Sequence, residues 1–508
     1  MRDTPPEDHP YNLGRVLADA LAARGAEPVL RCDGRAHTGP AIASAALAFQ
    51  AALGARGLDP GDRVLLLLRD TPAFFAAFIG AMRGGFVPVP ISTLAPPSEI
   101  AFISRDAGVC AVVVDAALPA DLRDTGLFGD VWLARASGGA IEGIDSGEAV
   151  AAVATRAGDP AFWLYTSGTT GRPKGVIHRH VDAEFTARQY AQGVLELGPG
   201  DRVLSAAKLF FAYGLGNALT FPLLLGSEIV LHPDRPTPGS MFELIEREVP
   251  TVFFGVPPLY AAMLAHSELP ERLGRVRLCV SAGEALPAPL FERWKERFGV
   301  EILDGLGSTE MLHIFLSNRP GAARPGSSGM PVPGYRLRVI DEARRDVRDG
   351  EIGALIAHGA SAARAYHDRP AETAQTMFSR GWLRTGDSYR RDPEGFYYHV
   401  GRTDDLIKVS GQYVSPVEVE SALMAHPAVV ESAVVGATDE NGLLKPKAFV
   451  VLRADSAPSD AFASELQAFV KARLAPHKYP RQIEFVDALP KTATGKVRRV
   501  ELRKEVRG

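Results

Sequence analysis

The sequence predicts an α/β protein: a large N-terminal domain of βα-layered sheets that includes a small β-rich part, and a small α+β C-terminal domain. The chain has 508 residues, too many for one hydrophobic core, so two or more domains are expected. Short apolar runs alternate with amphipathic runs from residue 11 to about residue 304, as in βα units and mostly parallel sheets. The pattern becomes β-rich after about residue 327 and mixed beyond about residue 402.

In the N-terminal part, predicted strands alternate with predicted helices. The run of Val and Leu at residues 64–68 predicts a buried strand. Further strands are predicted at residues 86–91, 111–114, 202–206, 228–231, 251–254 and 300–303. Helices are predicted at residues 72–82, 240–248 and 288–298. The stretch 137–158 is rich in Gly, Ala and Ser and predicts a surface connection. Several polar motifs follow these strands, where open α/β sheets bind their ligands.

The later part of the chain predicts short strands and then a separate small unit. Gly, Pro and Asp turns separate strands predicted at residues 335–340, 353–357 and 396–400. Residues 401–405 have the composition of a turn. Beyond this turn we expect helices at residues 416–425 and 461–474 and strands at residues 429–435 and 447–452. We therefore divide the chain into residues 1–401 and residues 402–508.

Composition excludes some classes of function. A formal net charge of −4 gives no electrostatic footprint for nucleic acid, and most of the basic cluster in residues 496–504 is expected on a solvated face. Cys32, Cys110 and Cys279 are few and widely spaced, which predicts buried free thiols in a reducing cytoplasm. Residues 1–10 lack the pattern of a signal peptide, and no apolar run has the length of a membrane span. We expect a cytoplasmic protein without nucleic-acid or membrane partners.

Residues 165–176 are the most informative stretch, Tyr-Thr-Ser-Gly-Thr-Thr-Gly-Arg-Pro-Lys-Gly-Val. Glycines let consecutive backbone N–H groups face one anion, hydroxyl groups add donors, and Lys174 adds a positive charge for polyphosphate. The spacing is not that of the P-loop, because Pro173 occupies a position where that motif requires Gly. A solvated turn is the alternative. The length and order of the motif favour another kind of nucleotide-binding loop.

This loop closely resembles the signature of the adenylate-forming superfamily, which includes acyl- and aryl-CoA synthetases, carrier-protein-loading adenylation domains and luciferases. Further superfamily signatures follow in the same order, at residues 281–286, 304–310, 385–387, 402–411 and 490–496. The resemblance therefore covers nearly the whole chain. It implies a large N-terminal domain and a mobile C-terminal lid, in agreement with the boundary drawn from composition, with a hinge near Asp404.

The resemblance implies that the loop holds the β- and γ-phosphates of ATP. The residues expected to bind these phosphates are Thr166, Ser167, Gly168, Thr169, Thr170 and Lys174. Thr309 would bond the α-phosphate. Glu310 would hold Mg²⁺, because this ion prefers oxygen ligands and keeps water and phosphate oxygens alongside one or two carboxylates. We expect Thr309 and Glu310 to take part in catalysis.

The resemblance also implies how adenosine is bound. Adenine is expected along the backbone of Gly283, Glu284 and Ala285. Asp304 falls where the family reaches the adenine amino group, and Leu306 stands where many members stack a Tyr on the ring. Asp387 and Arg402 match the ribose clamp, in which a carboxylate accepts from both hydroxyls and a guanidinium reinforces it.

Two motifs are expected to alternate at the site. In the adenylating pose, Lys496 would bridge the substrate carboxylate and the α-phosphate, because two anions do not approach each other unaided. In the thioester-forming pose, reached by rotation about Asp404, the CoA tunnel would be lined by Lys408, Ser410 and Gly411. Glycine suits this tunnel because a side chain would obstruct the pantetheine arm.

Residues 208–217 and 307–315 resemble the benzoate-CoA ligase subgroup. The residues expected to wall the acyl pocket are Phe211, Ala212, Tyr213, Gly214, Gly307, His313 and Ile314. Aromatic and β-branched walls suit a planar ring, and His313 offers a polar edge for a ring substituent. His178 and His180 have no partner cluster for a metal site, so we interpret them as structural.

The sequence therefore predicts an AMP-forming acid-thiol ligase. It would convert benzoate or a substituted benzoate, with ATP, Mg²⁺ and CoA, into aroyl-CoA, AMP and pyrophosphate through an aroyl-adenylate. The alternatives are an aryl acid adenylation enzyme that loads a carrier-protein phosphopantetheine and a non-enzymatic nucleotide-binding module. The sequence leaves open the ring substituents, the pathway, regulation by lysine acylation, and the choice between a monomer and a homodimer.

Overall fold

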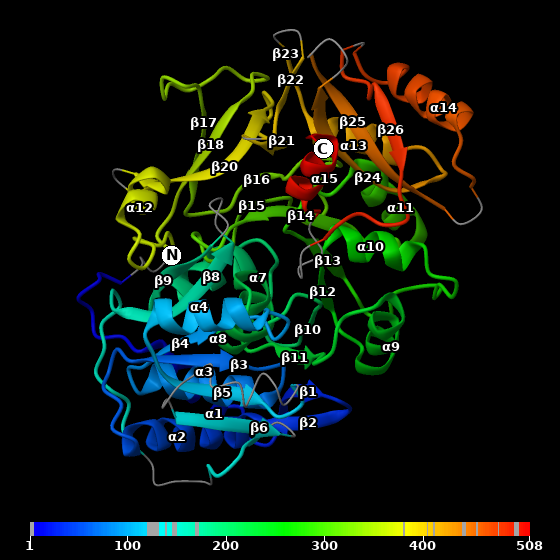
Figure 1. The fold of residues 1–508 in the computed structure, drawn as a ribbon. Coiled ribbons are helices and arrows are strands. Elements are labelled where there is room, and N and C mark those ends of the chain that lie inside the picture. The colour runs from blue at the N-terminus through cyan, green and yellow to red at the C-terminus, as the bar shows by residue number, and fades with distance from the viewer. Residues whose placement is uncertain are drawn as a thin grey trace.

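The computed structural model describes residues 5–118, 132–137, 140–144, 150–167, 172–378, 381–403, 405–409, 412–438, 443–453, 456–475, 477–491 and 497–507. For a few of these, among them Ser167 and Lys408, only the backbone is described. The fold is mixed α/β, with a large N-terminal part and a smaller C-terminal part at the top right of Figure 1. The predicted fold class is confirmed.

One N-terminal sheet has the strand order β4-β3-β5-β6-β7, and its strands pair in parallel except for the antiparallel pair β6–β7. Its strands are β3 (Arg63–Leu67), β4 (Val87–Pro90), β5 (Val109–Asp115), β6 (Trp132–Ser137) and β7 (Ala140–Ile141). The helices of this part are α1 (Leu13–Ala22), α2 (Gly39–Ala55), α3 (Pro72–Arg83) and α4 (Pro97–Ala107). Residues 72–82 of α3 are all buried, because this helix is apolar on every side and packs against α1, α2 and the sheet.

A second sheet has nine strands, in the order β16-β15-β14-β13-β12-β10-β11-β1-β2. Its strands are β1 (Pro28–Cys32), β2 (Arg35–Thr38), β10 (Arg202–Ser205), β11 (Glu228–Leu231), β12 (Val252–Gly255), β13 (Leu278–Ser281), β14 (Ile302–Gly307), β15 (Ile314–Ser317) and β16 (Met330–Pro331). In this sheet β14, β13, β12, β10, β11 and β1 pair in parallel, whereas β2, β15 and β16 pair in antiparallel fashion. Helices α9 (Pro238–Glu248), α10 (Pro257–Leu264) and α11 (Ala288–Phe298) connect its strands.

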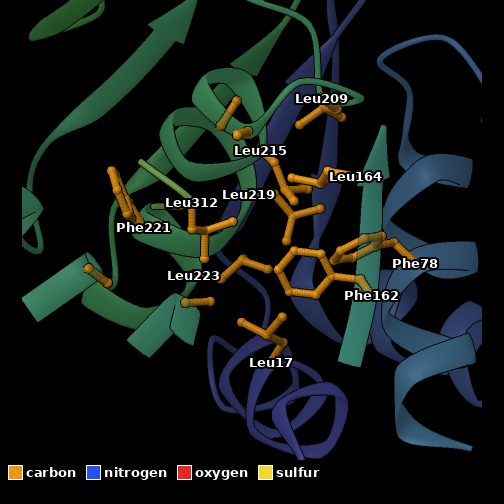
Figure 2. Packing of buried hydrophobic residues seen from close by; sticks show 14 of the residues in the cluster. Leu17, Phe78, Phe162, Leu164, Leu209, Leu215, Leu219, Phe221, Leu223 and Leu312 are labelled. Atoms are coloured by element: carbon orange, nitrogen blue, oxygen red, sulfur yellow. The ribbon is translucent and has the colours of Figure 1, made fainter. Parts of the chain in front are cut away.

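An antiparallel hairpin, β8 (Pro160–Ser167) and β9 (Pro173–Arg179), joins the two sheets. Beside it run α6 (Asp182–Thr186), the π-helix η1 (Ala187–Gln192), α7 (Ala212–Leu215), the π-helix η2 (Gly216–Thr220) and α8 (Phe221–Leu225). Figure 2 shows leucines of α7, η2 and α8 directed toward Phe162 of β8 and Phe78 of α3. This shared core fixes the hairpin and the helices to each other.

The β-rich part is an antiparallel sheet in the order β17-β18-β20-β19, with β21 paired to β20. Its elements are β17 (Arg336–Ile340), β18 (Gly353–His358), α12 (Pro370–Thr376), β19 (Met377–Phe378), β20 (Trp382–Arg391) and β21 (Tyr397–Arg402). The C-terminal part contains β22 (Ile407–Val409), β23 (Gln412–Val414), α13 (Pro416–Met424), β24 (Val429–Thr438), β25 (Leu444–Leu452), α14 (Asp460–Lys471), β26 (Gln482–Phe485) and α15 (Arg499–Arg507). Its core is separate from the N-terminal cores.

Some sequence predictions need correction. The strand predicted at residues 300–303 is β14, which continues to Gly307 because it pairs with β15. The strand predicted at residues 396–400 extends to Arg402, so the first two residues of the predicted turn belong to β21. The connection at residues 137–158 contains β7. Cys32 and Cys279 are buried free thiols, but Cys110 is only half-buried.

Arginines of the basic C-terminal cluster form ion pairs within the C-terminal part. Arg499 on α15 forms an ion pair with Glu420 at 2.8 Å, and Arg503 pairs with Asp405. These two guanidinium groups therefore hold α15 within the C-terminal part rather than facing only water. The division at residue 402 stays a prediction.

Candidate active site

The predicted phosphate-binding loop, residues 165–176, includes the end of β8 and the start of β9. Thr166 pairs with Lys174 in this hairpin. Lys174 is buried, and its Nζ lies 5.1 Å from the centre of the Tyr366 ring. Gly168, Thr169 and Thr170 lie outside the described residues. The pairing register of the hairpin therefore places Lys174 opposite Thr166, near the start of the loop.

Glu310 is bonded to the same tyrosine, Tyr366, whose ring lies near Lys174. The Tyr366 hydroxyl donates to Glu310 Oε1 at 2.7 Å, and the Ala363 backbone N–H donates to the Glu310 carbonyl at 2.7 Å. His178 Nε2 donates to the carbonyl of neighbouring Thr309 at 2.8 Å. Thr309 and Glu310 are thus held from both sides at the end of the β14 segment.

The donor set around Glu310 fits Mg²⁺. Among the residues that the structure describes, no three His, Cys, Asp or Glu side chains gather as metal ligands. The absence of such a group argues against a metal held by protein ligands alone within those residues. Mg²⁺ bound with a nucleotide needs only one or two carboxylates, because phosphate oxygens and water complete its octahedral coordination. Glu310 supplies such a carboxylate, and Tyr366 contacts both Glu310 and Lys174.

Asp304 offers a buried acceptor. It lies on β14 opposite Ser281 of β13, and its Oδ2 accepts from the Ser328 hydroxyl at 3.2 Å. Its Oδ1 is buried and has no hydrogen-bond partner within the described part of the chain. Burial raises the pKa of Asp304 to about 7, against the lowering effect of hydrogen bonds from Ser328 and two backbone N–H groups. A buried, unpaired carboxylate oxygen suits an amino group of a ligand.

The segment expected to line adenine follows β13. Gly283 has a left-handed φ of +95° and is exposed, and Glu284 and Ala285 after it are half-buried. Leu306 is half-buried near the end of β14. The turn at Gly283 follows β13, and both Asp304 and Leu306 lie on the neighbouring strand β14.

Asp387 and Arg402 face each other across the β20–β21 pair. Arg402 Nη1 lies 3.3 Å from Asp387 Oδ1, and His399 Nε2 lies 3.6 Å from the same oxygen. Burial alone would raise the pKa of Asp387, but the hydrogen bonds and charges of His399 and Arg402 outweigh it and hold this pKa below its usual value. Asp387 is therefore an anionic acceptor at neutral pH.

Three aromatic rings form a cage around His313, and only one of them, Tyr213, is an expected acyl-pocket residue. The ring of His313 lies 5.6 Å from that of Tyr213, 5.4 Å from that of Tyr190 and 4.4 Å from that of Phe221. Its Nε2 lies 3.1 Å from Asn217 Oδ1 and 3.3 Å from the Tyr213 carbonyl, two acceptors that require Nε2 to carry the proton. Burial lowers the pKa of His313 to about 3, so the ring is neutral.

The remaining expected pocket residues lie close in the chain to Tyr213 and His313 or on β14. Ala212 begins α7 and is buried, Phe211 caps that helix and is half-buried, and Ile314 is buried on β15. A Cβ at Gly214 would meet the Lys208 carbonyl at 2.1 Å, and one at Gly307 would meet the His313 backbone at 2.9 Å. Both glycines therefore permit close backbone contacts that other residues would disrupt.

The C-terminal part reaches the adenine segment. The Val497 backbone N–H donates to Glu284 Oε1 at 3.0 Å. Lys496, Asp404, Ser410 and Gly411 lie outside the described residues. The contact nevertheless fixes the residue next to Lys496 at the edge of the candidate nucleotide site.

Comparison with known proteins now adds the family. The model of the AMP-binding enzyme family matches residues 17–367, and that of the AMP-binding enzyme C-terminal domain matches residues 418–496. The chain belongs to the AMP-binding enzyme family.

Within this adenylate-forming family, the chain falls in the benzoate-CoA ligase subgroup. It is 49% identical to a benzoate–CoA ligase of Thauera aromatica, over 97% of this chain and 94% of that protein. The crystal structure of a benzoate CoA ligase from Burkholderia xenovorans is 45% identical, with a TM-score of 0.91 over 97% of this chain and 100% of that one. An anthranilate CoA ligase in complex with anthranoyl-AMP is 38% identical, with a TM-score of 0.92 over 99% of this chain and 98% of that one.

Several residues of this AMP-binding enzyme escaped the sequence analysis. They are Tyr190, Asn217, Phe221, Ser328, Tyr366 and His399, each of which contacts a predicted site residue or bonds to it. The two π-helical turns that carry Tyr190 and Asn217 have no signal in the sequence, although such turns are frequent at functional sites.

The two histidines interpreted as structural are confirmed as buried partners of the fold. His178 bonds to Thr309, and His180 Nδ1 accepts from the Leu13 backbone N–H at 3.1 Å. Burial lowers the pKa of His180 to about 4, so it is a neutral acceptor. Within the described ranges, no helix is both long and apolar enough to cross a membrane.

Proposed function

We propose that the chain is an ATP-dependent aryl-CoA ligase that acts on benzoate or a substituted benzoate. One observation carries this proposal: His313, which the aromatic rings surround, and the nucleotide-side groups Asp304 and Glu310 belong to one segment, β14–β15 and its connection. A planar acid bound against this cage would therefore lie beside the α-phosphate of ATP. The activities named for the relatives, ligation of benzoate and anthranilate to CoA, support the same substrate class.

In the first half-reaction, a carboxylate oxygen of the acid attacks the α-phosphorus of ATP, and pyrophosphate leaves with the electrons of the broken P–O bond. The phosphate loop and Lys174 hold the β- and γ-phosphates, and Thr309 holds the α-phosphate. Mg²⁺, held by Glu310, would neutralise phosphate charge. Lys496 offsets the repulsion between the two anions, so positioning and charge stabilisation supply the catalysis.

In the second half-reaction, the CoA thiolate attacks the carbonyl carbon of the aroyl-adenylate. A C–S bond forms, the bond between that carbon and the AMP oxygen breaks, and the thiol proton passes to solvent. We propose that the C-terminal part turns about Asp404 between the steps, which withdraws Lys496 and presents Lys408, Ser410 and Gly411 to the pantetheine arm. The enzyme would act in the cytoplasm, as a monomer or homodimer, where ATP and CoA are supplied.

The test is AMP release from ATP with a panel of acids, each with and without CoA. The panel contains benzoate, its hydroxy, amino and fluoro derivatives, cyclohexanecarboxylate, acetate and octanoate. CoA-dependent release confined to the benzoates is expected. Pyrophosphate formation without CoA turnover would favour loading of a carrier protein, and activity on aliphatic acids alone would refute an aryl pocket.

Replacement of Lys496 by Ala tests the mechanism. We expect adenylation to fall by about a hundredfold or more, because the stabilising charge of the transition state is lost. ATP binding, measured by calorimetry, should persist, since Lys174, Asp387 and Arg402 are intact. Full turnover of this variant would contradict the role of Lys496.

A further inference from the structure

Tyr366 contacts two groups of the proposed site at once. Its hydroxyl donates to Glu310 Oε1 at 2.7 Å, and the Nζ of Lys174 lies 5.1 Å from the centre of its ring. Its side chain is buried, with 6% of the residue exposed. One aromatic residue thus lies between the expected metal ligand and the expected phosphate-binding lysine.

The backbone around Tyr366 is fixed to both neighbours. Tyr366 forms a β-bridge with Val176 of β9, and the His367 N–H donates to the Gly175 carbonyl at 2.8 Å. The Tyr366 N–H donates to Thr373 Oγ1 at 3.0 Å. These contacts fix the backbone of Tyr366 to the strand that carries Lys174.

Each contact has a distinct physical effect. A hydrogen bond from a neutral hydroxyl to a carboxylate orients that carboxylate, as outer-shell partners of metal ligands do. An ammonium group near an aromatic face is attracted by the ring quadrupole, which restrains the flexible lysine before any phosphate arrives. The first effect depends on the hydroxyl alone, and the second on the ring.

We propose that Tyr366 is a positioning residue that aligns Glu310 for Mg²⁺ through its hydroxyl and Lys174 for the triphosphate through its ring. This inference rests on the proposed function for the identity of the ligands, Mg²⁺ and ATP. The competing explanation is packing alone, since Tyr366 also belongs to a small apolar cluster with Val176 and Ala363.

Two substitutions separate these effects. Tyr366→Phe removes the hydroxyl and keeps the ring, whereas Tyr366→Leu removes both. Tyr398→Phe is the matched control, because the Tyr398 hydroxyl also donates to a carboxylate, Asp392 Oδ2 at 3.1 Å, away from Glu310. ATP binding to each full-length variant is measured by calorimetry in magnesium and in excess EDTA, without acid or CoA, together with the thermal midpoint.

Tyr366→Phe should lose about tenfold in ATP affinity in magnesium and keep the wild-type affinity in EDTA. Tyr366→Leu should weaken binding in both buffers, and the control should change neither. If Tyr366→Leu does not fold, Tyr366→Phe alone decides. The proposal fails if Tyr366→Phe keeps the magnesium-dependent gain, if the wild type has no such gain, or if both affinities fall equally together with the thermal midpoint.

These titrations also separate the two proposals. Wild-type protein that binds ATP more tightly with magnesium but adenylates no acid of the panel would overturn the aryl-CoA ligase. The role of Tyr366 would still be judged by the same binding data.

Discussion

At the scale of single residues, Asp304 combines deep burial with an unpaired oxygen. Its carboxyl has a pKa of about 7, so near neutral pH it exists in both protonation states. Because this pKa is raised above the ordinary value, ionisation opposes folding, and the contribution of Asp304 to stability falls as the pH rises from about 4 to about 7. A ligand amino group reverses this preference, since it donates best to the ionised form.

We therefore predict that ATP binds more tightly as the pH rises through about 7. The expected gain is about tenfold between pH 6 and pH 8, because a charge-assisted hydrogen bond replaces a neutral one. The phosphates of ATP also titrate near this range, so Asp304→Asn provides the baseline. Calorimetry that gives the same pH dependence for this variant and the wild type would remove Asp304 from the adenine site.

At the scale of elements, the β20–β21 pair brings together Asp387 and Arg402, the two residues that we expect to clamp the ribose. Gly386 has a φ of +77°, which directs the backbone so that the Arg402 guanidinium lies across it. A Cβ at this position would meet Arg402 Nη2 at 2.5 Å. The pairing register of β20 and β21 brings Asp387 and Arg402 together, and the missing side chain of Gly386 leaves space for the Arg402 guanidinium.

We predict that Gly386→Ala weakens ATP binding by about tenfold and costs about 1 kcal/mol of stability. Gly395→Ala is the matched control: its φ is +89°, and its nearest contact is the flexible end of Met330 at 3.4 Å. The control should show a similar loss in denaturant unfolding and unchanged ATP affinity. Equal ATP affinity in both variants would show that Arg402 does not need this space.

At the scale of the whole molecule, the C-terminal part contacts the segment that we expect to line adenine, at the carboxylate of Glu284. The half-buried Glu284 accepts the Val497 N–H, next to the lysine that we expect to serve adenylation. This bond exists only while the C-terminal part faces the N-terminal part as it does in Figure 1. It should therefore stabilise the adenylating arrangement and not the thioester-forming one.

Glu284→Ala should slow aroyl-AMP formation by about tenfold, because a hydrogen bond to a charged group is lost in one arrangement only. Conversion of supplied aroyl-AMP to aroyl-CoA should keep its rate. Both half-reactions are measured separately in rapid-quench experiments, with Glu296→Ala, an exposed change on α11, as the control. Equal slowing of both half-reactions would argue against a role for Glu284 in choosing the arrangement.

The sequence by itself determined what depends on local pattern. Apolar runs and alternation predicted strands such as β11 and helices such as α11 at their observed bounds, since burial of one face imposes a period. Ordered motifs also led to the AMP-binding family and to contacts later observed, such as Asp387 with Arg402.

Only the tertiary structure decided which distant residues meet. Tyr366 bonds to Glu310 across 56 positions, and Asn217 bonds to His313 across 96. A tyrosine or an asparagine has no local signature for such a partner, because the bond forms only after separate strands and helices pack. The extension of β14 has the same cause: its glycines do not favour a strand, but pairing with β15 overrides that preference. Local sequence motifs thus predicted the residues of the candidate site. The residues that orient them, such as Tyr366 and Asn217, could be identified only from tertiary packing.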